Sequence, residues 1–385
     1  MINVNMYGRL CTAILVIGFF FASIAWQPVC SAAQQVVDQE ITTYIQKLFA
    51  NRAQYLLSQN DDVLRNFYLP ERSSSMRAMK HEQLRAKYVQ VWAEHRGVRF
   101  VEAGSNAKVV RINKRGDNVF ISAVDSLRLA YSYKGSSNTI EQFGIGTRHA
   151  LTLTRNNGNW HVLREWYLDP LEENPKLIPS LSKNIPRTVS RQHHSSKDIN
   201  PSSSAKSTKR YNRINAVHYA NTYAGLAWGA GNNNRYNKKY RDYTGLGGDC
   251  TNFASQCLGD KEGGGLKMKG GWHHYRSGGS RLWVQTDAFK SFLLYSGYGK
   301  LIKRGTFSDI TEASNKHPQG AWADLQPGDL IGHELDGDVD HFSIVVGFDA
   351  NGYPLVNSHT ADRYRVPFDL GWDQYTVYWL IHIRD

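Results

Sequence analysis

The sequence predicts an α+β protein with two folded domains joined by a polar linker. Residues 34–174 show helical periodicity followed by alternating strands, and residues 211–385 again combine helical segments with short strands. Between them, residues 175–210 are rich in Ser, Lys and Pro. Helices followed by a run of antiparallel strands are typical of α+β domains. A chain of 385 residues with 41% apolar composition can bury two ordinary hydrophobic cores.

The first 33 residues have the layout of a signal peptide. Arg9 is the one charged side chain ahead of the apolar run "LCTAILVIGFFFASIAW", and "QPVCSAA" ends in small residues. We predict cleavage near Ala33, so that the mature protein is secreted and keeps no membrane span. A retained anchor helix and a lipoprotein at Cys30 are the alternatives, although Pro28 and Val29 ahead of Cys30 fit lipidation poorly.

The charge of the chain indicates an anionic partner. The formal net charge is +12 and the pI about 9.4, which suits nucleic acid, anionic lipid or a teichoic-acid-bearing wall. More than half of this charge lies in segment 175–210, where Asp198 is the one acidic residue. The basic residues of the segment are Lys176, Lys183, Arg187, Arg191, Lys197, Lys206, Lys209 and Arg210. We interpret the segment as a flexible linker, either a solvated tether or a contact to peptidoglycan or another anionic cell-wall polymer. Because a secreted protein is separated from the chromosomal DNA, we predict no nucleic-acid partner.

Residues 34–174 begin with two predicted helices and continue as strands. Apolar residues share one face of the first helix, 36–60, and a second helix is predicted across 76–96. From residue 98 onward, polar residues alternate with β-branched and aromatic ones, and "NNGN" at 156–159 predicts a hairpin. By the order of its elements this domain resembles the cystatin-like cone of nuclear-transport-factor-type domains. It contains no catalytic constellation, so we predict a packing or binding role.

Residues 211–385 combine helices, a long loop and short strands. The segment "YNRINAVHYANTYA" predicts a helix, and the Gly-, Asn- and Tyr-rich stretch 225–248 predicts a loop. One helix is expected to start at Cys250 and another to cover "WVQTDAFKSFLLYSG". Strands are predicted at "GDLIGHE", "HFSIVVGFD", "PLVNSHT" and "TVYWLIHIR".

The stretch "GGDCTNFASQCL" contains both cysteines of the mature chain. Asp249 is a good N-cap residue, which places Cys250 in the first helical turn. Seven residues of helix rise about 10 Å, whereas a disulfide needs Cα atoms within about 7 Å, so Cys250 and Cys257 cannot pair. Cys257 continues an apolar stripe and is predicted to be a core residue. Cys250 lies where the helix N-terminus lowers a thiol pKa, which suits a nucleophile; an inert capping cysteine is the alternative.

A cysteine nucleophile needs a base, and His341 is the best placed of the histidines in 211–385. It opens the predicted strand "HFSIVVGFD" after the loop "LDGDVD", where a side chain can face a cleft. The turn "DANG" predicts a hairpin that places His341 about opposite His359 or Thr360. His359, or Asn357 one same-face step away, could then hold the His341 ring and fix its tautomer. The alternative for His341 is a structural histidine at the end of a strand.

These segments resemble the bacterial putative amidase domain family. The resemblance rests on "YNRINAVHYANTYA", "GGDCTNFASQCL", Trp272, Trp283, "LQPGDLIGHE", "DHFSIVVGFD" and "VNSHT", and it covers nearly all of 211–385. That family is similar to the papain-like wall hydrolases of the NlpC and CHAP (cysteine–histidine amidohydrolase/peptidase) groups. The resemblance implies a papain-like α+β domain with Cys250 as nucleophile, His341 as base and a polar third residue, for which we choose His359. It also implies hydrolysis of an amide bond, expected in wall peptide.

The remaining candidates concern the oxyanion and the substrate. The backbone N–H of Cys250 would help to hold an oxyanion. Papain-like enzymes often add a Gln a few residues before the cysteine, but this chain has none there. Asn252 could donate instead, or it could be a capping or packing residue. Trp272, Trp283 and Tyr243 are candidates for a substrate groove, with core packing as the alternative for the tryptophans.

The sequence therefore predicts a secreted, wall-associated cysteine amidase or peptidase. The adjacent histidines 273–274 lack spaced carboxylates or thiols, so we predict neither a metal nor another cofactor. Two alternatives are an inactive wall-binding or sporulation-associated module and a Cys–His acyltransferase. Wall binding without lysis would favour the first, and crosslinked rather than shortened products would favour the second.

Overall fold

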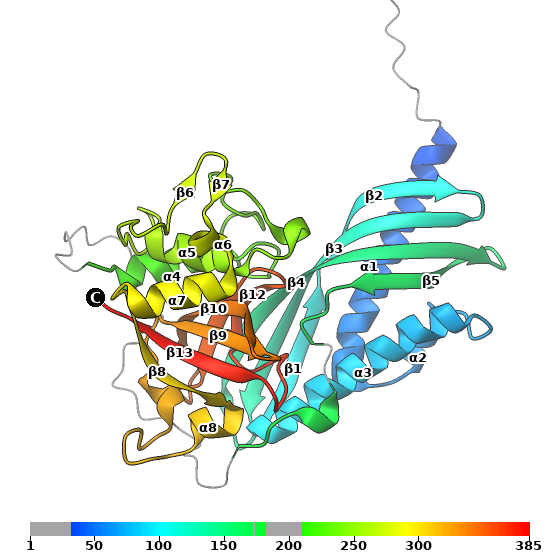
Figure 1. The fold of residues 1–385 in the computed structure, drawn as a ribbon. Coiled ribbons are helices and arrows are strands. Elements are labelled where there is room, and N and C mark those ends of the chain that lie inside the picture. Colours follow the sequence, from blue (N-terminus) through cyan, green and yellow to red (C-terminus); the bar gives the residue numbers. More distant parts are fainter. Residues whose placement is uncertain (1–31, 172–173, 182–209) are drawn as a thin grey trace, which may run out of the picture.

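The computed structural model describes residues 32–171, 174–181 and 210–385 (Figure 1). We refer to residues 32–181 as the first part and to residues 210–385 as the second part. The predicted signal peptide, apart from its last two residues, and most of the predicted linker lie outside the described residues.

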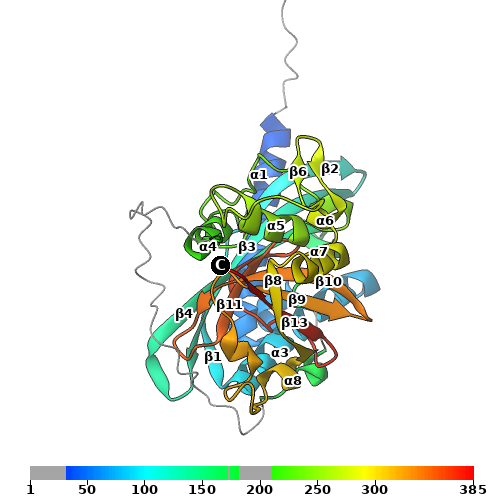
Figure 2. The same cartoon turned by 60° about the vertical axis from the view of Figure 1, so that its left-hand side comes forward.

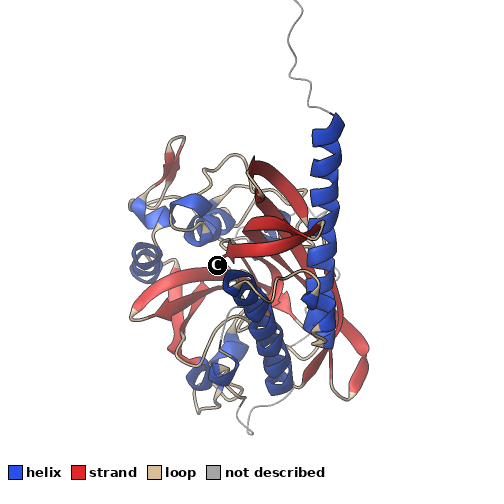
Figure 3. Cartoon of the chain, turned by 90° about the vertical axis from the view of Figure 1, so that its right-hand side faces the viewer, coloured by secondary structure: helices blue, strands red, loops and turns tan. Residues whose placement is uncertain are grey.

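The first part packs helices against long strands. Its elements are α1 (Ala32–Ser58), α2 (Asp62–Arg65), α3 (Ser73–Arg96), β1 (Val98–Ser105), β2 (Lys108–Arg115), β3 (Asn118–Tyr133), β4 (Ser136–Asn156), β5 (Asn159–Tyr167) and η1 (Pro175–Leu177). The predicted helices at 36–60 and 76–96 and the change to strands at 98 are confirmed. α1 runs along the strands as a 27-residue helix and buries the predicted apolar face through Ile41 and Ile45 (Figure 3).

β4 and β5 are joined by the predicted hairpin at 156–159. Asn156 pairs with Asn159, and the two residues between them, Asn157 and Gly158, have φ angles of 48° and 80°. Two consecutive residues with positive φ form a type I′ turn, which Asn-Gly adopts at low cost.

The second part places helices over antiparallel strands. The helices and 3-10 turns are α4 (Arg213–Thr222), η2 (Thr244–Leu246), α5 (Cys250–Gly259), α6 (Arg281–Val284), α7 (Thr286–Tyr295), α8 (Phe307–Thr311) and η3 (Ala321–Asp324). The strands are β6 (His274–Tyr275), β7 (Gly278–Gly279), β8 (Gly299–Thr306), β9 (Leu330–Leu335), β10 (Asp338–Phe348), β11 (Pro354–Ser358), β12 (Asp362–Pro367) and β13 (Val377–Ile383). β8 and β12 are absent from the sequence prediction. β12 carries Asp, Arg and Pro, and two of its charged residues, Asp362 and Arg363, are buried against partners elsewhere in the chain.

β10 begins three residues before His341 rather than at it. Asp336 and Gly337, both with positive φ, form the turn between β9 and β10. The predicted loop "LDGDVD" is therefore largely a tight hairpin. A bulge between Val339 and His341 inserts one extra residue, so that Val339 packs in the core beneath the helices and His341 lies opposite His333.

One 11-stranded sheet runs through both parts of the described chain (Figure 1). Its order is β1-β3-β4-β12-β11-β10-β9-β13-β8, with β2 added on β3 and β5 on β4. β4 and β12 make the junction, where Asp362 lies opposite Gly146 and Tyr364 opposite Gly144. The two parts predicted as separate domains thus share one antiparallel sheet.

The junction between the parts is closely packed and hydrogen-bonded. Asp369 of the second part accepts hydrogen bonds from Arg96 Nε at 2.9 Å and Trp92 Nε1 at 3.0 Å, both on α3. A Cβ at Gly144 would lie 2.1 Å from the carbonyl oxygen of Trp228, so glycine is needed for this close approach. These contacts fix the second part on the first.

The folded body continues past residue 175, where the linker was predicted to start, as far as residue 181. Ile178 is buried, and the carbonyl of Pro179 accepts a hydrogen bond from Arg96 Nη1 at 2.7 Å. The carbonyl of Leu177 accepts another from the backbone N–H of Gln374 at 2.8 Å. These residues are therefore not part of a solvated tether.

Helices cover one face of the strands of the second part (Figure 2). α4, α5 and α7 pack on β10 over a core that includes Phe253, Phe289 and Phe342. On the opposite face, Trp322, Phe368 and Tyr378 form a second core with α8. The mixed α+β class is thus confirmed. Among the described residues, none of the helices has both the length and the apolar character that a membrane span requires.

Candidate active site

α5 presents Cys250 at its N-terminus, as the sequence predicts. Asp249 precedes the helix, but its carboxylate makes no capping hydrogen bond, so the predicted capping role is wrong. Its Oδ1 instead accepts hydrogen bonds from the backbone N–H of Tyr243 at 2.9 Å and from Asn252 Nδ2 at 2.8 Å. The carboxylate thereby ties the preceding loop to the first turn of the helix.

Cys250 and Cys257 are both free thiols, as their spacing on one helix predicts. Cys257 is completely buried in the core with Phe253 and Leu258. Burial raises its thiol pKa well above the ordinary value. Cys257 is therefore a core residue, in agreement with the prediction.

The Cys250 thiol lies against the backbone of β10 on both sides of His341. Its Sγ is 3.9 Å from the carbonyl oxygen of Asp340 and 3.8 Å from Thr251 Oγ1, and the backbone of Phe342 also contacts it. The structure therefore brings the predicted nucleophile to the strand residue predicted as its base. The side chains of Cys250 and His341 are not hydrogen-bonded to each other: the thiol contacts Thr251 and Asp340, and His341 Nε2 has no partner.

The pairing of β10 explains why a helix terminus can approach it here. β11 pairs with β10 only over Ile344 to Phe348, starting where Ile344 lies opposite Asn357. Nearer the hairpin turn, this edge of β10 has no strand partner among the described strands. The backbone groups of Asp340 and Phe342 that contact the thiol lie along this open edge.

Burial makes both candidate groups neutral in this arrangement. It raises the pKa of the Cys250 thiol, outweighing the contacts from Phe342 and Thr251 that favour the thiolate. Burial also lowers the pKa of His341 to about 3, and Arg363 and His359 act in the same direction. The expected lowering of the thiol pKa by the helix terminus is thus overridden by desolvation in this state.

Buried polar atoms without hydrogen-bond partners gather around His341. Strand pairing places His333 opposite both His341 and Tyr378, and Ser343 and Ser358 directly adjoin the paired residues Ile344 and Asn357 of β10 and β11. The unpaired cluster, as we call it, consists of His333, His341, Ser343, Ser358 and Tyr378. It holds six of the nine such atoms among the described residues. Because buried polar groups normally find partners, this concentration is the strongest structural sign of function in the second part.

Arg363 borders the unpaired cluster, opposite Ser358. Its guanidinium is buried and donates to the carbonyls of Leu370 and Pro170, but it forms no ion pair with any described carboxylate. Burial lowers its pKa to about 10. A guanidinium in this position disfavours a second positive charge on His341.

The predicted orienting residue His359 is engaged elsewhere. Its Nδ1 pairs with Asp249 Oδ2 at 2.6 Å, and its Nε2 lies 2.7 Å from the carbonyl oxygen of Tyr223. The ring is stacked between Tyr236 and Phe253, with centroid distances of 3.7 and 3.9 Å. Since both nitrogens are committed, His359 cannot hold the ring of the predicted base in this geometry. The pair with Asp249 locks the loop before α5.

The two asparagine candidates are also satisfied by other partners. Asn357 donates to the carbonyl of Ala220 at 3.0 Å and accepts from the backbone N–H of Arg365 at 2.7 Å, so it does not orient the predicted base. Both amide donors of Asn252 are used, and its oxygen accepts from Trp283 Nε1 at 2.9 Å. Asn252 is the packing residue of the two alternatives rather than an oxyanion donor.

The groove prediction is wrong for both tryptophans. Trp272 and Trp283 are completely buried, and Trp272 Nε1 donates to Ser255 Oγ at 3.0 Å. Tyr243 is half-buried in the loop before Cys250, where its hydroxyl accepts from the backbone N–H of Gly279 at 2.9 Å. Of the three candidates, Tyr243 alone has a partly exposed side chain.

His333 is the site residue that sequence reasoning missed. It lies in "GDLIGHE", a segment predicted correctly as a strand, and the signal was a histidine within an otherwise apolar run. Its position opposite His341 depends on the bulge in β10, which no local pattern indicates. In the part of the chain that the structure describes, no three His, Cys, Asp or Glu side chains are grouped to hold a metal ion.

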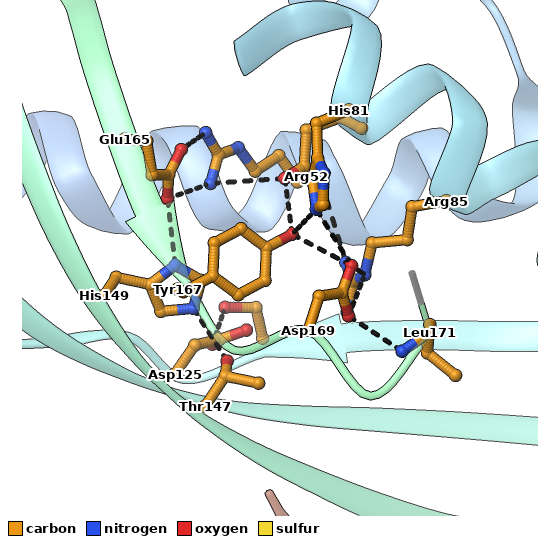
Figure 4. Close-up of polar contacts among 12 residues, drawn as sticks. Arg52, His81, Arg85, Asp125, Thr147, His149, Glu165, Tyr167, Asp169 and Leu171 are labelled. Carbon is orange, nitrogen blue, oxygen red and sulfur yellow. Dashed lines mark hydrogen bonds and ion pairs between the residues drawn. The ribbon is translucent and has the colours of Figure 1, made fainter. Parts of the chain in front are cut away.

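The first part also encloses buried charged residues, but these are hydrogen-bonded to one another (Figure 4). Glu165 accepts from Arg52 Nη1 and pairs with His149 Nδ1, both at 2.9 Å. Tyr167 donates to Glu82 at 2.8 Å. The paired network, as we call it, consists of Arg52, His81, Glu82, Arg85, His149, Glu165, Tyr167 and Asp169. Although burial opposes ionisation, Arg52 and His149 lower the pKa of Glu165. The sequence analysis did not predict this network.

Comparison with known proteins finds a family model that matches the second part. Residues 210–381 match the family model described as putative amidase domain. The uncharacterized protein YhbB of Bacillus subtilis (strain 168) is 30% identical over 161 residues, which cover 40% of this chain and 42% of that protein. The match thus spans less than half the length of this relative.

Two solved structures align with about a third of the chain at TM-scores too low to establish a shared fold. A variant of Rv3472, a function unknown protein from Mycobacterium tuberculosis, aligns at TM-score 0.24 and 12% identity over 36% of this chain and 76% of that one. The intermembrane space region of the chloroplast protein ARC6 aligns at TM-score 0.24 and 12% identity over 34% and 94%. Residues 210–381 are therefore similar to putative amidase domains, which supports an amidase-like hydrolase.

Proposed function

We propose that the second part is a cysteine amidase or peptidase that cuts an amide bond in peptidoglycan peptides. The observation that carries the proposal is the Cys250 thiol at the first residue of α5, lying against β10 on both sides of His341. A thiol, an imidazole and unpaired helix N–H groups are the parts that thioester chemistry needs. The antiparallel sheet under a helix that carries the cysteine is consistent with a papain-like arrangement, and the helices and strands of the first part with a cystatin-like one.

The mechanism starts from a neutral thiol and a neutral imidazole. His341 takes the proton of Cys250 as the sulfur attacks the amide carbonyl, which gives a tetrahedral intermediate. The backbone N–H of Cys250 donates to the oxyanion. His341 then gives its proton to the leaving amine as the C–N bond breaks and a thioester remains. Water, deprotonated by His341, hydrolyses the thioester and restores the thiol. Catalytic hydrogen bonds often tighten only when substrate binds, so His341 is expected to approach the thiol at that stage.

We assign the positioning role to His333 instead of His359 or Asn357. Its ring centroid lies 5.6 Å from that of His341, and Trp372 stacks on it at 4.1 Å, which fixes its plane. Neither ring nitrogen of His333 has a hydrogen-bond partner of good geometry, although backbone groups of Phe368 and His341 lie near the ring, and His341 Nε2 also has no partner. A hydrogen bond between the two imidazoles, direct or through one water, would satisfy both and fix the tautomer of His341.

Export and wall association complete the proposal. They rest on the signal-peptide layout of the first 33 residues and on the basic residues concentrated in 175–210. The two alternative functions, an inactive wall-binding or sporulation-associated module and a Cys–His acyltransferase, predict different products. The first leaves wall fragments unchanged, and the second lengthens or crosslinks them.

The test is a product analysis of purified peptidoglycan fragments incubated with the mature protein. We expect new amines and shortened fragments with wild-type protein, and a loss of at least about 1,000-fold in rate for Cys250→Ala and for His341→Ala. Cys257→Ala serves as the matched control and should keep the activity of the folded fraction. Fragments that stay intact with wild-type protein, or activity that survives Cys250→Ala, would reject the proposal.

A further inference from the structure

A pocket of about 560 Å³ opens between α3 and β5 in the first part. We call it the α3–β5 pocket. From α3 it is lined by Arg77 and His81, one helical turn apart, and from β5 by Arg164 and Trp166. Its volume is in the range of about 300–1,000 Å³ that small-molecule sites occupy. Nothing in the proposed hydrolysis uses this pocket, which belongs to the other part of the molecule.

Three members of the paired network, His81, Glu165 and Tyr167, line the α3–β5 pocket. Figure 4 shows the polar contacts that join them to the rest of the network. Glu165 and Tyr167 line the pocket while their polar atoms bond Arg52, His149 and Glu82. The Glu165 side chain is only 3% exposed and has its charge balanced from below. The Glu165 carboxylate is thus paired internally with the Arg52 guanidinium, which weakens its repulsion of an anion in the pocket.

The rim of the pocket is positively charged. Arg77 and Arg164 are both exposed, and neither forms an ion pair with another described residue. Arg77 lies on α3 and Arg164 on β5, and each guanidinium can donate two parallel hydrogen bonds to a carboxylate or phosphate. The rim therefore selects for a negatively charged group.

Trp166 adds a flat apolar surface beside these charges. It is 71% exposed on β5, which is unusual for so large an apolar side chain on a strand. An indole face accepts the C–H faces of a sugar ring, and its polar edge stays in water. A ligand that uses both features has a sugar ring next to an anionic group.

From these observations we propose that the α3–β5 pocket binds an anionic saccharide. Arg77 and Arg164 hold the carboxylate or phosphate, and Trp166 stacks on the sugar ring. The first part is then a glycan-binding module that holds the second part against a polymer. The proposal is independent of cysteine chemistry, because it concerns glycan alone.

The experiment measures binding of peptide-free glycan to the full mature chain by calorimetry at low salt. The probes are soluble glycan strands bearing muramic-acid carboxylates, N-acetylglucosamine 1-phosphate, and neutral chitotetraose. We expect one or both anionic probes to bind at least about tenfold more tightly than chitotetraose. Whether the carboxylate or the phosphate probe binds better identifies the ligand's anionic group. The absence of any preference for charge would overturn the proposal.

Matched variants separate a specific site from general attraction. Arg77→Ala/Arg164→Ala and Trp166→Ala should each weaken binding at least about tenfold. The control Lys108→Ala/Arg111→Ala removes two exposed positive charges from β2 of the same part and should change affinity less than about twofold. Equal losses in the two double variants, or no loss in either, would contradict the assignment. Because the probes contain no peptide, either result is separate from success or failure of the amidase proposal.

Discussion

The paired network of the first part and the unpaired cluster of the second part are both buried, yet they differ in how their polar atoms are satisfied. In the paired network, Glu165 and Tyr167 reach charged or hydrogen-bonding partners from α1, α3 and β4. In the unpaired cluster, His333 and Tyr378 have polar atoms with none. A completed network stabilises a fold, whereas isolated buried polar atoms cost stability and persist where chemistry uses them. Burial of polar residues alone therefore does not identify a functional site; a concentration of buried polar atoms without partners is the better indicator.

The largest expected effect on stability is in the paired network. Arg52→Met should lower the free energy of unfolding by about 3–5 kcal/mol, because it leaves the Glu165 carboxylate buried without its guanidinium. Arg155→Met is the control: this arginine also pairs with a glutamate, Glu40, but its side chain is 46% exposed, so the loss should stay below about 1 kcal/mol. Urea denaturation of both variants measures the difference. Similar losses would remove the distinction between a buried network and a surface pair.

A matched pair of Tyr→Phe changes tests the comparison directly. Tyr167→Phe removes a hydroxyl that bonds Glu82 at 2.8 Å and should cost about 2 kcal/mol. Tyr378→Phe removes a buried hydroxyl without a partner and should leave the free energy of unfolding unchanged or raise it by up to about 2 kcal/mol. Chemical denaturation under identical conditions compares them. If Tyr378→Phe cost as much as Tyr167→Phe, its hydroxyl would have a partner and the cluster would not be unpaired.

The pH dependence of stability tests the unpaired cluster through the titration of His341. Burial lowers the folded pKa of His341 to about 3, while the unfolded chain binds this proton below about pH 6.5. The stabilising effect of keeping His341 neutral is therefore fully present above pH 6.5 and is lost as pH falls toward 3. The slope is about 1.4 kcal/mol per pH unit for one histidine. His341→Leu should flatten the stability profile between pH 6 and 4. A profile identical to wild type would show that His341 takes up its proton without unfolding.

The smallest expected effect concerns the positioning residue His333. His333→Ala should change the pH profile of Cys250 alkylation, because the tautomer of His341 is no longer fixed. His333→Gln keeps a hydrogen-bonding side chain and should restore part of the wild-type profile. Ser343 belongs to the same cluster but lies opposite Ile331 rather than His333, so Ser343→Ala is the control. Its Cys250 should be alkylated as in the wild-type protein. If alkylation responds to His341→Ala but to neither His333 variant, the positioning role is wrong and the amidase proposal stands.

Local patterns in the sequence were sufficient for the elements that carry the site. The helix that begins at Cys250, the strand with His341 and the Asn-Gly hairpin all follow from periodicity and turn chemistry. The separation of two free thiols followed from helix geometry. These features depend only on residues close in the chain.

What could not be predicted depends on long-range pairing. The bulge before His341 places this residue opposite His333, while His359 is bound to Asp249. The junction of β4 with β12 makes one sheet from two expected domains. Desolvation of Cys250, which reverses the expected direction of its pKa shift, also results from tertiary packing. Sequence periodicity contains none of this information.

The most direct test of the central claim is the pH dependence of Cys250 alkylation in the purified mature protein. Peptide mass spectrometry separates Cys250 from Cys257, the buried internal control. Although burial raises the thiol pKa of Cys250, we expect Cys250 to react far faster than Cys257 near neutral pH because His341 accepts its proton, and we expect His341→Ala to remove most of this difference. A Cys250 that reacts as slowly as Cys257, or that is indifferent to His341→Ala, would contradict an activated cysteine at the start of α5.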